Sequence, residues 1–438
     1  MNQEGRLKWN FYAALVCKCI VLCNRVLIVP IFFQSWGPEY FGVWLLLSSI
    51  PVFLSLPQVG LGTASSTQIV LAIGRGEERR ANELLGSAWL FTISTGILVL
   101  AIILICSARG YVIDFGGTAE NVKIRETLVI SILFASFILS TMRQPLEGYW
   151  TARNQASNAM LFGGAALGAE SIVVATVLIC GGRAELLAVM ILGTRVFAMV
   201  TFGIATVKYI DCRLPLVPNW NLTKALLGVG IGYQLSALWQ ALLFQGSLFL
   251  AQSVFGPSGV AAWGAIRTLT RAGNQLLELI NQSLMPEMQN QIAKGNFADA
   301  RRLYQSAVQL ACIIGLVFAI PLGLFGGIVY DFWIGSNFFV TQWIWPIMST
   351  ALVLNAIWLT SSVVQRAYNQ PWYLSLVGLL SALVSLFSMY VVGQQFGLLG
   401  FAVGSVVFEA LMAFAIPRHS QKLLNRSSTK MENPVCPF

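Results

Sequence analysis

A small set of charged side chains stands inside segments that are otherwise strongly apolar. The cations are Lys18, Arg25, Arg195, Arg267 and Arg271, and the anions are Glu170, Glu278 and Glu409. A charged side chain at the centre of a bilayer costs about 2.5–3.5 kcal/mol on insertion scales, so these groups must line water or other protein instead of lipid. Because the cations outnumber the anions, the set predicts binding of an anion, and guanidinium groups hold phosphates with paired hydrogen bonds.

One expected helix, residues 259–285, gathers its polar residues on one face. At about 100° per residue, a sector less than half the circumference wide holds Arg267, Thr270, Arg271, Asn274, Gln275, Glu278, Asn281 and Gln282. We expect this stripe to line a solvated cavity. Three alternatives stay open: a pair between Arg271 and Glu278, a helix that lies on the membrane surface, and buried polar packing.

The other charged groups fall on other expected helices. Lys18 and Arg25 are seven residues apart and therefore share one helix face. Glu170 and Arg195 lie near the middle of two helices, where they either serve a binding site or lock the N-terminal half through a salt bridge. Carboxyl groups in apolar surroundings are suited to carry protons, so the three glutamates are candidate ion-coupling residues.

The elements that must position these groups are membrane-spanning helices. The chain has 438 residues, of which 56% are hydrophobic and 10% charged, whereas soluble domains are about one quarter charged. A helix crosses the hydrocarbon with about 20 apolar residues. We therefore predict an all-α integral membrane protein of about twelve transmembrane helices, at residues 9–33, 40–73, 84–108, 125–142, 158–180, 185–207, 224–251, 259–285, 303–330, 343–365, 372–392 and 398–416.

The second expected helix is too long for one straight span. Pro51, Pro57, Gly60 and Gly62 lie within it, and prolines in a helix interior kink or break it.

Lys and Arg gather in alternate links and at both ends of the chain. By the positive-inside rule, this bias predicts an even number of spans and two cytoplasmic termini.

The sequence repeats itself. Residues from Gly37-Pro38 to Ala88 match residues 219 positions further on, from Gly256-Pro257 to Ala307. A weaker echo pairs residues 152–155 with 367–370. The repeat predicts two six-helix lobes, 1–215 and 216–417, related by a pseudo-twofold axis along the membrane normal and followed by a cytoplasmic tail, 418–438. This architecture is typical of transporters, with the substrate site between the halves.

Several classes of function are disfavoured. The net charge of +9 arises mostly from residues in short links, so it does not indicate nucleic acid. His419 is the only histidine, which excludes a Ser-His-Asp triad and an H-E-x-x-H zinc site. The cysteines have no metal-binding spacing, and the chain has no phosphate-binding loop. We expect no enzyme activity, no metal and no cofactor.

Three motifs carry a resemblance to a known family. They are residues 37–44 (GPEYFGVW), residues 60–62 (GLG) and residues 72–76 (AIGRG). Together with the echo in the eighth expected helix, they resemble the polysaccharide-transport branch of the multidrug/oligosaccharidyl-lipid/polysaccharide flippase superfamily, in which O-antigen flippases look nearest. The resemblance covers essentially the whole chain.

The resemblance implies a substrate and a place in the cell. The substrate would be a polyprenyl-pyrophosphate-linked oligosaccharide, moved between the leaflets of a bacterial inner membrane by alternating access. A glycan polymerase and a chain-length regulator would be partners, and a proton or sodium gradient would drive transport. Related peptidoglycan-precursor flippases line their cavity with arginines at places similar to Arg25, Arg267 and Arg271. They also use a basic residue in the second helix, where this chain has Val52.

Roles for the other candidates follow as hypotheses. Arg195 and Lys18 would add positive potential, and Asn274, Gln275 and Asn281 would form hydrogen bonds with sugar hydroxyls.

One rival function is a multidrug or cation antiporter of the same superfamily, for which a cavity lined by carboxylates would be expected. A second is a membrane-embedded polysaccharide polymerase, which would need a large outer loop. A scaffold in a glycan-assembly complex stays open as a further alternative.

Overall fold

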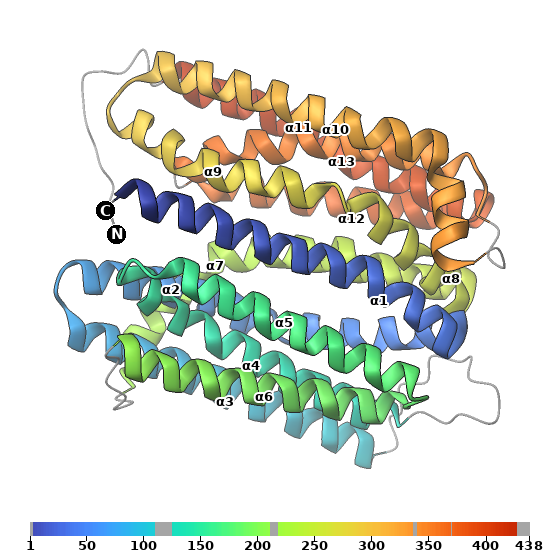
Figure 1. Ribbon diagram of the computed structural model, residues 1–438, viewed down its shortest axis with the longest axis horizontal. Coiled ribbons are helices and arrows are strands. Elements are labelled where there is room, and N and C mark those ends of the chain that lie inside the picture. Colours follow the sequence, from blue (N-terminus) through green and yellow to red (C-terminus); the bar gives the residue numbers. More distant parts are fainter. Residues whose placement is uncertain (1–2, 110–124, 211–217, 336–339, 369, 427–438) are drawn as a thin grey trace. The chain divides into compact units, whose positions relative to one another are not determined.

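The computed structural model describes residues 3–109, 125–210, 218–335, 340–368 and 370–426. Residues 427–438 of the predicted tail, and Asn369 of the weaker sequence repeat, lie outside the described residues. Every element in the described residues is helical (Figure 1). The first elements are α1 (Gln3–Leu54), α2 (Leu56–Gly74), α3 (Glu78–Ala108), α4 (Glu126–Ala152), α5 (Ala156–Ile179), α6 (Ala184–Ile210) and α7 (Trp220–Ala241).

A short π-helix, η1 (Leu242–Gly246), joins α7 to the next helix. The remaining elements are α8 (Ser247–Arg271), α9 (Asn274–Ala293), α10 (Phe297–Ile334), α11 (Ile344–Ala367), α12 (Pro371–Phe396) and α13 (Leu398–Arg426). Ten stretches of the described helices are long and apolar enough to cross a membrane. Two of them, Tyr12–Leu54 and Gln234–Arg271, bend at Gly37 and Gly256 and so each join two predicted helices. The ten stretches therefore overlap all twelve predicted helices, while the later parts of the second and eighth lie in α2 and α9, outside these stretches.

The described chain forms two units, Met1–Ala265 and Ile266–Phe438. In the first unit α1 packs on α5, α4 on α6, and α7 on α2. In the second unit α13 packs on α11 and α12, and α10 on α11. Because α7 packs on α2, the first unit continues past residue 215; the lobe boundaries 1–215 and 216–417 stay a prediction.

Each unit has its own apolar core. In the first, Leu61, Leu84, Leu146 and Phe202 belong to one buried cluster. In the second, a cluster contains Met288, Tyr304, Val364 and Leu424. Many large apolar side chains remain exposed on the outer helix faces, such as Phe332 at 93%. Apolar surface on this scale is what a bilayer covers, and the protein is a multi-pass integral membrane protein.

The backbone repeats with the sequence. Gly37 (φ 72°, ψ 172°) and Gly256 (φ 70°, ψ −173°) hold the same left-handed conformation, which costs glycine little. The last residues of α2 and α9, Gly74 and Ala293, are 219 positions apart in the sequence. The first residues of α3 and α10 are also 219 positions apart. The weaker echo also marks equivalent places, because α4 ends at Ala152 and α11 at Ala367.

The predicted break in the second helix is confirmed. It falls at Ser55, between α1 and α2, and Pro57 stands in the first turn of α2. Proline is tolerated there because its missing N–H would lack an intrahelical partner anyway. The eighth expected helix differs from the prediction, since residues 272–273 separate α8 from α9. The helical wheel for residues 259–285 assumes one continuous helix, so the polar face that it assigns does not continue past Gly273.

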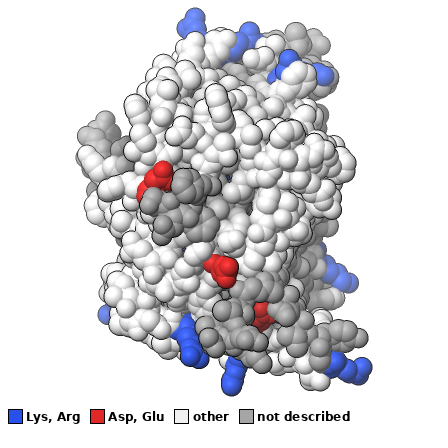
Figure 2. All heavy atoms as spheres, turned by 90° about the vertical axis from the view of Figure 1, so that its right-hand side faces the viewer, with Lys and Arg blue, Asp and Glu red and all other residues white. Residues whose placement is uncertain are grey.

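The end of the helices remote from the termini is poor in basic side chains. Figure 2 shows this face largely uncharged, with Asp and Glu side chains on it and Lys and Arg towards its edges. This is the pattern expected for the outer side of a membrane protein. The orientation itself stays a prediction.

Candidate functional site

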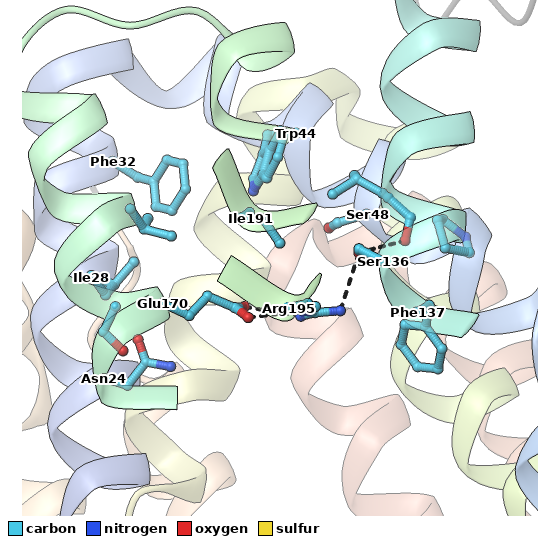
Figure 3. A pocket seen from close by; sticks show the side chains of 14 residues that line it. Asn24, Ile28, Phe32, Trp44, Ser48, Ser136, Phe137, Glu170, Ile191 and Arg195 are labelled. Atoms are coloured by element: carbon cyan, nitrogen blue, oxygen red, sulfur yellow. Dashed lines mark hydrogen bonds and ion pairs between the residues drawn. The ribbon is translucent and has the colours of Figure 1, made fainter. Parts of the chain in front are cut away.

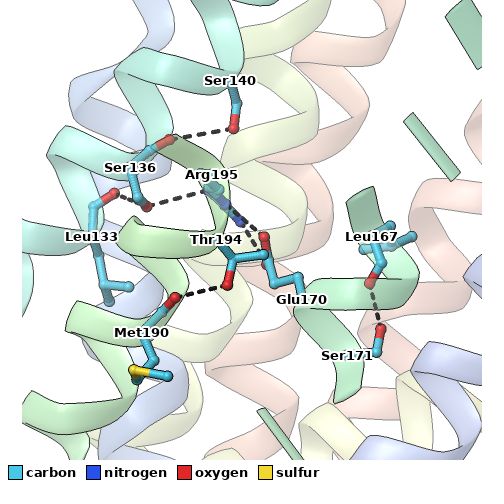
Figure 4. A network of polar contacts seen from close by, with 9 residues as sticks. All are labelled: Leu133, Ser136, Ser140, Leu167, Glu170, Ser171, Met190, Thr194 and Arg195. Carbon is cyan, nitrogen blue, oxygen red and sulfur yellow. Dashed lines mark hydrogen bonds and ion pairs between the residues drawn. The ribbon is translucent and has the colours of Figure 1, made fainter. Parts of the chain in front are cut away.

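The first unit contains an ion pair between neighbouring helices. Arg195 of α6 donates from Nε to Glu170 Oε2 at 2.8 Å and from Nη2 to Glu170 Oε1 at 2.9 Å. Its Nη1 donates to Ser136 Oγ of α4 at 3.2 Å (Figure 4). This two-pronged geometry uses the planar fork of the guanidinium. The salt bridge that the sequence left open is thus present.

Two cavities adjoin this pair, and both are lined by Glu170 and Arg195. The larger, of about 260 Å³, also contacts Asn24, Ser48 and Ser136 (Figure 3). The smaller, of about 170 Å³, is lined on α4 by Ser140 and Arg143. The side chains of Glu170 and Arg195 are 18% and 28% exposed, so the pair is accessible from these cavities.

The second unit contains another ion pair, deeper in the protein. Glu409 of α13 accepts from Arg271 Nη2 at 3.1 Å on Oε1. On Oε2 it accepts from Asn355 Nδ2 at 3.1 Å and Trp358 Nε1 at 2.6 Å. The Glu409 side chain is 6% exposed and that of Arg271 25%. The sequence had suggested no partner for Glu409, and the structure supplies three donors.

The remaining candidates are placed as follows. Arg25 is exposed and Lys18 half-buried, while Asn24 lines the larger cavity. Arg267 is half-buried; Asn274, Gln275 and Asn281 are buried.

Glu278 of α9 attracts Arg366 of α11 electrostatically. Each of the three candidate carboxylates therefore interacts with an arginine. Their proposed part in ion coupling stays a prediction.

The sequence missed the residues that complete the two pairs. Asn355 and Trp358 lie three residues apart on α11 and so share a helix face. A polar asparagine within an apolar span was the signal that could have marked this face. Ser136 gave no comparable signal, because serine is common in transmembrane helices.

Comparisons with known proteins bear on the fold. No protein-family model and no curated protein matches the chain. An inward-facing multidrug resistance MATE family transporter of the MOP superfamily matches with a TM-score of 0.77 and 17% identity, covering 96% of this chain and 100% of that one. The outward-facing form of a MATE family transporter matches with a TM-score of 0.72 and 15% identity, over 97% and 96%.

A MATE structure in complex with MaL6 gives a TM-score of 0.68 at 16% identity, over 96% of this chain and 98% of that one. The chain has a MATE-like fold. It is all-helical with two six-helix lobes, as the sequence predicted, and the fold is that of transporters. Identities this low show the fold alone, so substrate and branch are matters for proposal.

Proposed function

We propose that this protein is a flippase that moves a polyprenyl-pyrophosphate-linked oligosaccharide, such as a surface-polysaccharide repeat unit, from the inner to the outer leaflet by alternating access. Arg25, Arg267 and Arg271 bind the pyrophosphate, and Arg195 and Lys18 add positive potential. Asn274, Gln275 and Asn281 meet the sugar. A proton or sodium gradient drives the cycle.

One observation carries the choice of an anionic substrate. Glu170 and Glu409 already form ion pairs, with Arg195 and Arg271. A cationic drug needs an available carboxylate, and both of these glutamates are already neutralised by a guanidinium group. Five cations against three anions inside the spans favour a phosphate-bearing substrate.

The second candidate function is a multidrug or cation antiporter. The MATE-like fold favours it, since the matching transporters are described as multidrug resistance proteins. Under this alternative Glu170 would accept the drug or the coupling ion from the cavity that it lines.

The test is flipping of a fluorescent polyprenyl-pyrophosphate oligosaccharide in reconstituted vesicles. We expect protein-dependent flipping that falls at least tenfold in Arg267→Ala and recovers partly in Arg267→Lys, because a point charge replaces part of the guanidinium's binding. Arg79→Ala is the matched control, since the Arg79 side chain is 93% exposed and pairs with Glu83.

Unchanged flipping in Arg267→Ala would remove the role assigned to Arg267. Absence of flipping by folded wild type over several glycans and an imposed proton gradient, together with efflux of a cationic dye, would establish the antiporter instead.

A further inference from the structure

The hydrogen-bond donors to Glu409 divide between its two oxygens: two neutral donors meet Oε2, and one charged donor meets Oε1. Asn355 and Trp358, both from α11, donate to Oε2 at 3.1 and 2.6 Å. Arg271, from the end of α8, donates to Oε1 at 3.1 Å. The neutral donors can hold the carboxyl group in place whether or not Arg271 is bound, because they use a different oxygen.

Few other charges lie on the helices that pack against Glu409. No charged residue occurs on α12, whose titratable groups are Tyr373 and Tyr390. On α11 the one charged residue is Arg366, which interacts with Glu278 of α9. The charges of α10 lie at its two ends, within 299–302 and at 331. Among the described residues, Arg271 is the cation that the structure places against Glu409.

Arg271 can reach a ligand that Glu409 cannot. Its side chain is 25% exposed, against 6% for Glu409. It is also the last residue of α8, directly before the break at residues 272–273. The exposed part of the Arg271 side chain, next to this break, is therefore where a ligand can compete with Glu409 for the guanidinium.

We propose that Glu409 and the pyrophosphate of the substrate compete for Arg271, and that Glu409 takes up one proton whenever Arg271 binds the substrate. This coupling rests on the proposed function. When the phosphate oxygens accept the N–H groups of Arg271, Glu409 keeps only neutral donors. A buried carboxylate without a cation is costly, and a proton from water on Oε1 removes the cost. Release reverses the step: Arg271 returns to Oε1 and the proton leaves to water.

The scheme makes Asn355 and Trp358 positioning residues. They keep Oε2 fixed while Oε1 alternates between the guanidinium and a proton. Substrate and proton therefore bind together, and the proton neutralises Glu409 for as long as Arg271 holds the substrate.

The experiment is calorimetric titration of the purified protein with a short-chain prenyl pyrophosphate, in buffers of different ionisation enthalpy at one pH. We expect about one proton taken up per molecule bound by wild type and about none by Glu409→Gln. Glu409→Gln should also bind severalfold more tightly, because the competing carboxylate is gone. Arg302→Gln is the control: its side chain is 83% exposed beside Asp299, and it should match wild type.

Proton uptake near zero in a wild type that binds, or equal uptake in Glu409→Gln, overturns the coupling and leaves the proposed function intact. No binding of any prenyl pyrophosphate by wild type overturns the proposed function instead. A second measurement tests the proton step without substrate. Infrared spectra of folded Arg271→Gln should show a protonated carboxyl group that Arg271→Gln/Glu409→Gln lacks, and absence of this band overturns the proposal by itself.

Discussion

Each unit holds one of the two arginine–glutamate pairs described above, and these two pairs differ in burial and in how the guanidinium meets the carboxylate. Arg195 grips both oxygens of Glu170, and both side chains line cavities. Arg271 donates to one oxygen of Glu409, whose side chain is 6% exposed and is also held by two neutral donors. In the first pair the guanidinium holds both carboxylate oxygens and the site is wetter; in the second it holds one carboxylate oxygen and the site is drier.

The difference separates two properties that are often treated as one. Burial sets what it costs to lose a partner, because water cannot replace that partner in a dry site. The number of bonds between guanidinium and carboxylate sets how strongly the pair itself resists exchange, because a guanidinium on one oxygen gives up fewer bonds to that carboxylate. The first pair is therefore suited to hold helices together and the second to change partners. The predictions below test this division, from the largest expected effect to the smallest.

Arg271→Gln should have the largest effect on stability. Removing one partner of a buried pair costs about 3–5 kcal/mol of unfolding free energy. The loss should grow as the pH rises and shrink as it falls, because at lower pH a proton neutralises the Glu409 carboxylate that has lost its cation. Unfolding in mixed detergent micelles of rising SDS fraction, followed by tryptophan fluorescence, measures this change.

The matched variant is Arg271→Gln/Glu409→Gln, which removes both charges and should recover most of the loss. If the double variant is as unstable as the single one, the cost lies in side-chain packing and not in the buried charge.

Arg195→Gln should cost less, about 1.5–3 kcal/mol, the value of hydrogen bonds to a charged group. Water in the two cavities can solvate the Glu170 carboxylate that is left behind, even though Arg195 donates to both of its oxygens. The same unfolding measurement, completed with Glu170→Gln and the double variant, gives the coupling energy. A larger loss for Arg195→Gln than for Arg271→Gln would mean that bond count outweighs burial.

Ser136→Ala removes the hydrogen bond that Arg195, of the wetter pair, donates to Ser136. It should lower the free energy of unfolding by about 0.5–1.5 kcal/mol. Ser136 accepts one hydrogen bond from Arg195 and lines the larger cavity, so water can take its place. Trp358→Phe is the matched change at the drier pair and should cost more, because Glu409 loses one of its three donors and its side chain is only 6% exposed, so water replaces that donor less readily. Equal losses in the two variants would contradict the assigned difference in water access.

The sequence predicted the first pair better than the second for a physical reason. Glu170 and Arg195 are 25 residues apart, on consecutive helices joined by a short link. Such helices pack antiparallel, so mid-span residues meet. Arg271 and Glu409 are 138 residues apart, and their meeting depends on how distant helices pack.

The helices themselves were predictable from hydropathy, and the break at Ser55 from its prolines. The break at residues 272–273 was not, because Gly273 alone carries too weak a signal to end a helix. Its position rests on packing, since Gly273 lies against Phe318 of α10, where a Cβ would come within 3.2 Å of the ring.

Arg79→Ala should have the smallest effect, and it calibrates the series. Arg79 Nε lies 3.1 Å from Glu83 Oε1, the same distance that separates Arg271 from Glu409. The Arg79 side chain is 93% exposed, however, and an exposed pair one helical turn apart contributes about 0.3–0.5 kcal/mol. Because arginine precedes glutamate here, the less favourable order on a helix, the lower end applies. Two ion pairs with the same N–O distance should thus differ about tenfold in their contribution to the free energy of unfolding. A loss in Arg79→Ala comparable to that in Arg271→Gln would show that distance, and not burial, sets this contribution.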